Sequence, residues 1–127
     1  MSTKKAIKTD LFESSSPLEW AITSNNTLYT AQIPIDKNGI VVEGGIEEQT
    51  RQTMNNLVHT LESAGVTTNE VLQVLIYVTK RDYLSVVNKI YAEYFEAPYP
   101  NRAAVVVAGL ARENMLVELV VYAQASK

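Results

Sequence analysis

Val71-Leu72-Gln73-Val74-Leu75-Ile76-Tyr77-Val78-Thr79 is the stretch that decides the fold, because it is almost continuously apolar and rich in β-branched and aromatic residues. Such a run predicts a β-strand that is covered on both faces. Two similar strands follow at Ala103–Ala108 and Leu116–Ala123. None of the three alternates between apolar and polar residues, as a strand with one solvent-exposed face does.

The segments on either side of the 71–79 strand have the 3.6-residue period of helices. Residues 46–64 place their apolar side chains on one stripe, and Gly65 is a natural helix end. Asp82 is placed to cap a second helix, which the prolines of the stretch 98–100 end.

Shorter strands are expected near the start of the chain. Ala6–Thr9 could form an edge strand, and Trp20–Thr23 and Leu28–Gln32 flank an Asn-Asn pair that indicates a hairpin. The resulting order, β-β-β-α-β-α-β-β, predicts an α+β fold with two helices packed on one sheet, in a single domain over residues 1–127. Because two helices cover only one face, we expect a second copy of the chain on the other face, and therefore a homo-oligomer.

The composition excludes several classes of protein. The chain has 127 residues, no Cys and one His, His59, so disulfides, thiol nucleophiles and cysteine-based metal sites are excluded. A net charge of −3 does not favour nucleic-acid binding. The apolar runs are far shorter than a membrane span, and no targeting segment is recognised. We expect a cytoplasmic protein with no cofactor, no metal and no membrane partner.

Glu118 and Arg102 are the two residues that stand out as chemical candidates. Glu118 interrupts an apolar strand, where a carboxylate needs a cationic partner, a cavity or an exposed strand edge. Arg102 follows a rigid Pro-Tyr-Pro-Asn approach and has the planar fork that holds a carboxylate, although an ordinary loop-end Arg would look the same. A tight hairpin of the last two strands would leave the two residues roughly 13 Å apart, so they could meet only through another strand order or another subunit.

Five motifs in the right order resemble one known family across nearly the whole chain. They are Pro100–Leu110 (PNRAAVVVAGL), residues 116–119 (LVEL), 32–36 (QIPID), 49–57 (QTRQTMNNL) and 87–95 (VNKIYAEYF). This set closely resembles the reactive-intermediate deaminase (RidA, or YjgF) family, which also carries the name endoribonuclease L-PSP.

The resemblance implies a chorismate-mutase-like fold in which the 71–79 strand lies between the last two strands. It also implies a homotrimer whose sheets pack together inside, with ligand clefts between subunits. Family members hydrolyse enamines and imines such as 2-aminoacrylate to a 2-keto acid and ammonia. This chemistry suits a chain without Cys or metal, because an imine carbon is already electrophilic.

The same resemblance implies a role for individual residues. Arg102 matches the family's Arg that clamps the substrate carboxylate, Glu118 the Glu that positions or activates water, and Asn88 a cleft Asn on the second helix. Two positions depart from the family pattern: Leu18 stands where the family usually has a cleft Tyr, and Ala104 where many members have a Cys.

Three functions follow from this pattern. The first is hydrolytic deamination of small imines and enamines. The second, which Leu18 and Ala104 favour, is a non-catalytic or altered-specificity site that binds small carboxylates such as keto acids. The third, ribonuclease activity, is assigned to some family members but is disfavoured by the acidic pI of about 5.1, the single His and the absence of a basic patch.

Overall fold

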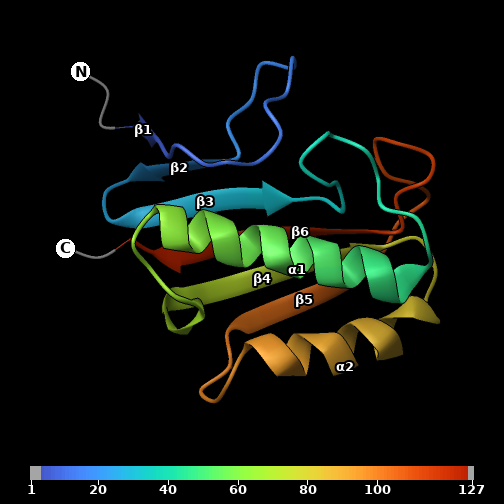
Figure 1. Cartoon of the computed structure of the whole chain (residues 1–127). Helices are drawn as coiled ribbons and strands as arrows, with labels where there is room; N and C mark the ends of the chain where they lie inside the picture. The colour runs from blue at the N-terminus through green and yellow to red at the C-terminus, as the bar shows by residue number, and fades with distance from the viewer. Residues whose placement is uncertain (1–3, 126–127) are drawn as a thin grey trace.

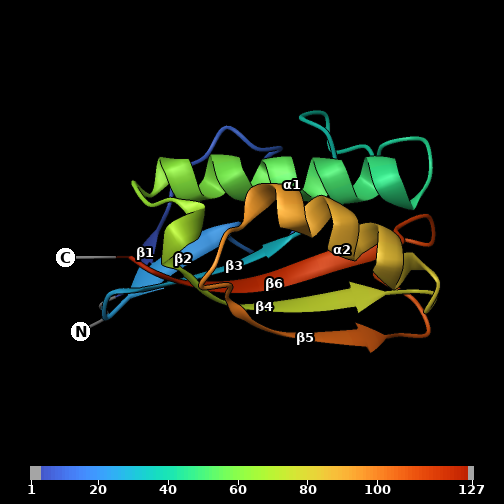
Figure 2. The same cartoon turned by 90° about the horizontal axis from the view of Figure 1, so that it is seen from below.

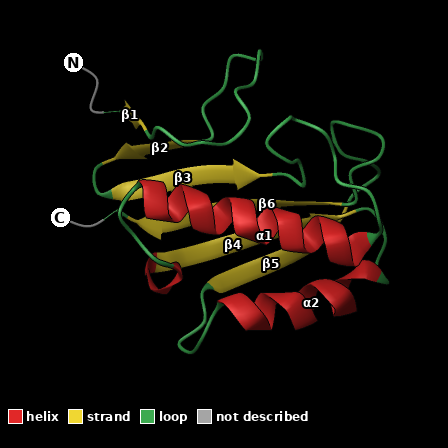
Figure 3. Ribbon diagram, viewed as in Figure 1, coloured by secondary structure: helices red, strands yellow, loops and turns green. Residues whose placement is uncertain are grey.

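A computed structural model of the chain describes residues 4–125. In chain order its elements are β1 (Lys5–Ala6), β2 (Ala21–Ser24), β3 (Thr27–Gln32), α1 (Ile46–Ser63), the 3-10 turn η1 (Thr68–Glu70), β4 (Val71–Val78), α2 (Tyr83–Tyr94), β5 (Asn101–Val106) and β6 (Val117–Gln124) (Figures 1 and 3). The succession of strands and helices is the one that the sequence predicts.

The described strands form one six-stranded sheet in the order β1-β2-β3-β6-β4-β5. Neighbouring strands are antiparallel except for the parallel pair β4 and β5. Figure 2 shows both helices on the same side of the strands. The predicted α+β fold, a mixed sheet with two helices on one face, is therefore confirmed. Because β4 lies between β5 and β6, the last two strands do not form a tight hairpin, and the placement implied by the family resemblance is correct.

The two faces of β4 differ in burial. Val74, Ile76 and Val78 are completely buried beneath the helices, whereas Leu75 and Tyr77 on the opposite face are only partly buried. In one chain only the helix side of this strand is covered; the cover expected on the other face, a second copy of the chain, stays a prediction. β6 alternates between buried and half-buried residues in the same way, although its sequence is apolar on both faces. We call the face without helices the open face.

Helix α1 is fixed to the sheet by polar as well as apolar side chains. Leu57 and Leu61 are buried in the main core. Beside them, the buried amide of Gln32 on β3 donates hydrogen bonds to the hydroxyls of Thr30 (2.8 Å) and Thr60 (2.9 Å). These hydrogen bonds fix the position of α1 relative to β3, because a shift of the helix along the sheet would leave buried polar groups without partners.

Three local features differ from the sequence prediction. The edge strand spans Lys5–Ala6 instead of 6–9. β5 begins at Asn101, before the predicted 103–108 strand, because the side chain of Gln73 on β4 donates to the Asn101 side chain (2.7 Å) and extends the pairing. Asp82 precedes α2 as predicted but does not cap it, since its own helical backbone (φ −61°, ψ −20°) keeps the carboxylate away from the first free N–H groups.

No helix within residues 4–125 is both long and apolar enough to cross a membrane.

Candidate functional site

The predicted site residues fall into two groups on opposite faces of the sheet. Arg102 pairs with Val74 in β4, and paired residues of neighbouring strands point to the same face, so Arg102 lies on the helix side. Glu118 pairs with Tyr77, one of the residues on the open face. The two backbones are roughly 14 Å apart, from two strand spacings and three residues along β4. One chain therefore does not bring Arg102 and Glu118 together.

The Arg102 group is built between β5 and α2. The guanidinium donates a hydrogen bond to the side-chain oxygen of Asn88, in the middle of α2. Its central carbon lies 4.8 Å above the ring of Tyr91, which is within the range of a cation–π contact. Both partners are neutral, and within residues 4–125 no carboxylate forms an ion pair with Arg102. Its positive charge is left uncompensated.

Tyr91 is almost completely buried, at 5% exposure. Burial raises the pKa of its hydroxyl above the usual 10, and the charge of Arg102 together with a side-chain contact from its guanidinium partly opposes this rise. The central guanidinium carbon lies over the ring face, and no group in the described part of the chain reaches the hydroxyl with full hydrogen-bond geometry. The phenol is therefore neutral at physiological pH.

Ala104 belongs to the Arg102 group. It pairs with Ile76 and so points to the same face as Arg102, two residues further along β5. Ala104 is exposed and contributes only a methyl group. The surface beside Arg102 therefore lacks any thiol or other reactive side chain at this position.

Glu118 lies in a pocket of about 290 Å³ beside β3 and β6. Most of the wall is apolar and includes Leu18, Trp20, Ala31, Ile33 and Met115. Two charged side chains, Glu19 and Arg112, also line it, and Arg112 donates to the backbone oxygen of Gly39 at 2.6 Å. The sequence left three environments for Glu118: a cationic partner, a cavity or an exposed strand edge. In the structure its side chain lines a cavity.

Desolvation in this pocket raises the pKa of Glu118 above its ordinary value of 4.5. Glu118 has no hydrogen-bond or ion-pair partner among residues 4–125 that would lower it again. A carboxylate with a raised pKa accepts and returns protons more readily near neutral pH. Glu118 is therefore chemically suited to general acid–base catalysis.

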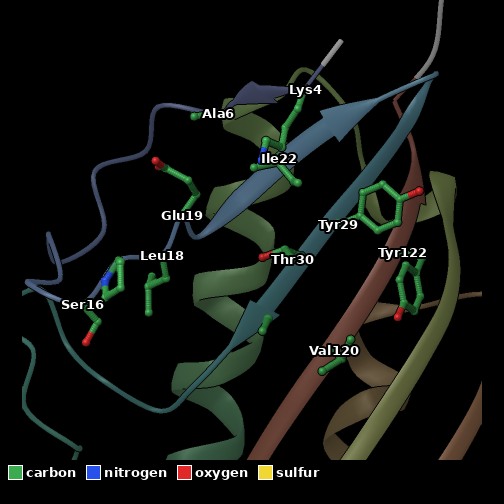
Figure 4. Close-up of a pocket in the computed structure, with 12 residues that line it drawn as sticks. Lys4, Ala6, Ser16, Leu18, Glu19, Ile22, Tyr29, Thr30, Val120 and Tyr122 are labelled. Atoms are coloured by element: carbon green, nitrogen blue, oxygen red, sulfur yellow. The ribbon is translucent and has the colours of Figure 1, made fainter. Parts of the chain in front are cut away.

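The segment that carries Leu18 closes one side of this pocket. The indole nitrogen of Trp20 donates to the backbone oxygen of Phe12 (2.6 Å), and the backbone N–H of Asp10 donates to His59 on α1 (2.9 Å). Leu18 remains 47% exposed and also borders a wide concavity of about 990 Å³ on the open face, where Figure 4 shows it beside Ser16 and Glu19, across from Tyr29 and Tyr122. His59 beside the apolar stripe of this helix is partly exposed, as its position in the sequence predicts, and it anchors this segment to α1.

Residues 9–125 match the family described as Endoribonuclease L-PSP. The chain belongs to this family. This L-PSP family chain is 39% identical over 109 residues to a RutC family protein of Pyrococcus horikoshii, which covers 84% of this chain and 86% of that protein. It is 32% identical over 102 residues to the human protein named 2-iminobutanoate/2-iminopropanoate deaminase, covering 79% and 74% of the two chains.

Solved structures of the same family have the same fold. A Rid family protein from Yersinia pestis superimposes with a TM-score of 0.90 at 38% identity, over 95% of this chain and 98% of that one. RidA from Psychrobacter gives a TM-score of 0.88 at 27% identity, over 94% and 98%. The resemblance to the RidA family that the sequence motifs indicate is confirmed.

Sequence reasoning missed two contributors to this L-PSP family site. The apolar helical repeat that includes Tyr91 predicts core packing for this residue, but its three-residue spacing from Asn88 also places both on one helix face, beside Arg102. Gln49 on α1 donates to the backbone oxygen of Asn114 (2.8 Å) and accepts from the backbone N–H of Leu116 (2.7 Å). It thereby fixes the turn that leads into β6 and Glu118, a role that only long-range contacts reveal.

The site offers no evident place for a metal. Within residues 4–125 no three His, Asp or Glu side chains are grouped closely enough to bind one. The chemistry available to the described residues is anion binding by Arg102 and proton transfer by Glu118.

Proposed function

We propose that this protein hydrolyses small imines that carry a carboxylate, and enamines that tautomerise to them, releasing ammonia and a 2-keto acid. Glu118 carries the proposal, because it is an unpaired carboxylate of raised pKa on the wall of a mostly apolar pocket. The human and mouse relatives, at 32% and 34% identity, are named 2-iminobutanoate/2-iminopropanoate deaminase. Those names describe substrates of this class.

The complete site is formed between two copies of the chain. Arg102 and Glu118 face opposite sides of the sheet in one chain, so a shared substrate needs Arg102 of one copy and Glu118 of another. The open face supports such an assembly, because Tyr29 (41%) and Val105 (45%) leave much apolar surface exposed. A homotrimer, as the family resemblance implies, would bury this surface and form three identical sites.

The reaction needs only binding and proton transfer. An enamine such as 2-aminoacrylate first takes a proton on its terminal carbon and becomes the imine. The imine formed in this way is protonated on nitrogen. Water then adds to its carbon: a C–O bond forms, the C=N π electrons move to nitrogen, and a water proton passes to Glu118, which leaves a neutral carbinolamine. Glu118 returns this proton to the amino group. The hydroxyl of the carbinolamine then gives its proton to Glu118 while its O–H electrons form the C=O bond, and the C–N bond breaks. Ammonia takes the proton from Glu118 as it leaves, and the 2-keto acid remains.

The other site residues act around this step. Arg102 binds the substrate carboxylate with its uncompensated charge, and Asn88 orients the guanidinium. Leu18 and Ala104 shape the pocket without supplying a hydroxyl or a thiol. Activation therefore rests on orientation and on Glu118 alone.

Turnover is tested with imines generated in the assay. 2-Aminoacrylate or 2-iminobutanoate is produced by a separate enzyme, and keto-acid formation is followed against the spontaneous rate. We expect acceleration by the wild type and a loss of about 10- to 100-fold in kcat/KM in Arg102→Ala, since a charge-assisted contact to the substrate is removed. Arg81→Ala, at an exposed position before α2, is the matched control. A wild-type rate equal to the spontaneous rate for several imines would refute the proposal.

A mixing experiment tests the shared site. Arg102→Ala and Glu118→Gln chains alone should retain at most about one tenth of wild-type activity, but random co-assembly restores both residues in some sites, giving about one quarter of wild-type activity. A site within one chain would give none. Sedimentation should also show three times the 14.1 kDa mass of the chain; a stable monomer would contradict the assembly.

A second candidate function is binding of keto acids without turnover. The exposed aliphatic Leu18 favours it, because the pocket has no hydroxyl at that position to orient water. Saturable binding of 2-oxobutanoate that Arg102→Ala abolishes, in a wild type that hydrolyses no imine, would establish this function instead.

A further inference from the structure

The guanidinium of Arg102 is held by two side chains of one helix face. Asn88 and Tyr91 are three residues apart on α2, so their side chains are neighbours. Asn88 accepts one hydrogen bond from the guanidinium, whose central carbon lies over the Tyr91 ring, 4.8 Å from its centre. One hydrogen bond leaves a planar group free to rotate, whereas a ring beneath it fixes the orientation of the plane.

The Tyr91 ring is itself packed in the core. The Phe95 ring lies one helical turn further on, at 4.5 Å between centroids and 31° between planes. Both rings are 5% exposed and belong to the main core. The guanidinium therefore rests on a surface that is part of the packed interior.

The residue type at position 91 has a cost that packing does not explain. The Tyr91 hydroxyl is buried without a hydrogen-bond partner among residues 4–125. A buried polar group without a partner destabilises the folded state, and phenylalanine would fill the same space without it. Tyrosine and phenylalanine share an aromatic ring face, and at position 91 this face lies under Arg102.

We propose that Tyr91 is a positioning residue for the carboxylate clamp: its ring holds the Arg102 guanidinium in one plane by a cation–π contact. Because neither Tyr91 nor Asn88 carries a charge, Arg102 is oriented without being neutralised and keeps its charge for an anion. The identity of that anion rests on the proposed function, whereas the coupling of Tyr91 to Arg102 does not. A Tyr91 that serves only core packing would not depend on the charge distribution of its ring.

The test changes the ring's charge distribution at constant shape. Position 91 is replaced by phenylalanine and, in a second protein, by pentafluorophenylalanine, whose ring face is no longer negative. The same fluorinated residue at position 95 is the matched control, because that ring contacts Tyr91 and does not face Arg102. Three measurements are made: affinity for 2-oxobutanoate by calorimetry, KM and kcat, and the NMR order parameter of the arginine Nε–H groups.

We expect Tyr91→Phe to retain the affinity and order of the wild type. Pentafluorophenylalanine at position 91 should weaken 2-oxobutanoate binding by about two- to thirty-fold. It should raise KM without lowering kcat, and lower the order parameter of Arg102. Arg51, bound in bidentate fashion to Glu93, should keep its order parameter in every protein. Equal Arg102 order parameters in the phenylalanine and pentafluorophenylalanine proteins would overturn the proposal.

The order parameter separates this proposal from the proposed function. Loss of Arg102 order in a protein that neither binds keto acids nor hydrolyses imines would refute the deaminase function and uphold the role of Tyr91. Imine hydrolysis by the wild type, together with an Arg102 order parameter that pentafluorophenylalanine does not change, would support the deaminase function and refute the role of Tyr91. Because phenylalanine and its fluorinated form have nearly the same shape, a folding defect common to both is not mistaken for the effect.

Discussion

Replacing Glu118 by glutamine should stabilise the protein and abolish turnover at the same time. The carboxylate lies on a pocket wall, where none of residues 4–125 pairs with it to compensate its loss of hydration, and this burial raises its pKa. Glutamine has the same shape and no charge, so it removes the cost of burying the ion. It also removes the proton acceptor, which lowers kcat by about 10²- to 10⁴-fold.

The stabilisation depends on pH in a defined direction. Because the pKa of Glu118 is raised in the folded protein, the folded state holds this proton more tightly than the unfolded state does. Stability is therefore complete below the ordinary pKa of 4.5 and is lost as the pH rises through the higher folded value. The gain of Glu118→Gln should be absent near pH 4 and should grow as the pH rises through the folded pKa of Glu118. Since part of the carboxylate stays hydrated, we expect on the order of 1 kcal/mol instead of several.

Urea unfolding at pH 4 and pH 7 measures this difference, at one fixed protein concentration because assembly contributes to stability. Glu113→Gln, at an exposed loop position, reports the effect of removing any surface carboxylate. A Glu118→Gln protein that is less stable than the wild type at pH 7 would refute the reasoning. It would mean that a cation, such as Arg112 on the same pocket wall, pairs with Glu118 in solution.

Three further changes test the framework around the site. Asn56→Ala should lower the free energy of unfolding by about 2–4 kcal/mol, because the Asn56 amide donates to two backbone carbonyls after β3 at 3.0 and 2.9 Å. Denaturant unfolding measures this loss, and a value well below about 1 kcal/mol would show that water replaces the amide. Gly39→Ala should cost about 1–3 kcal/mol, since Gly39 has φ +79° and a Cβ would lie 2.7 Å from the Phe12 ring; Gly65→Ala (φ +77°, open space) is the control, and an equal loss there would assign the effect to φ alone. Arg51→Ala should lower Tm only slightly, and high salt should remove the difference, because its pair with a glutamate of α2 is exposed; an effect that persists in high salt would contradict this.

The existence of each strand and helix was predictable, but the neighbours of each strand were not. Periodicity reports local structure, whereas the insertion of β6 between β3 and β4 depends on pairings between distant segments. The continuous apolar run of β6 was interpreted as burial on both faces. In one chain Val121 is buried and Tyr122 only half-buried. The apolar residues on the open face are therefore typical of a buried surface, although a single chain leaves that face partly exposed.

The residue types of the site were predictable, but their grouping was not. Arg102 stood out because its guanidinium follows a rigid Pro-Tyr-Pro-Asn turn, and Glu118 because its carboxylate interrupts an apolar strand. Their separation onto opposite faces follows from the register of β4 with both neighbours, through Val74 and Tyr77. Tyr91 was correctly assigned to the core, but nothing in its spacing indicated that β5 would place a guanidinium on its ring.

The strand order also bears on how the chain is made. β6 is the last strand in chain order, yet it occupies the interior of the sheet between β3 and β4. During synthesis on the ribosome, β1–β3 and the pair β4–β5 are therefore made before the strand that joins them. Until β6 is added, β3 and β4 each have an unpaired edge that can pair with a strand of another unfinished chain. Because these contacts join distant segments, the fold closes late and as a whole. A chain interrupted before residue 117 would present two such edges permanently and would be prone to aggregate.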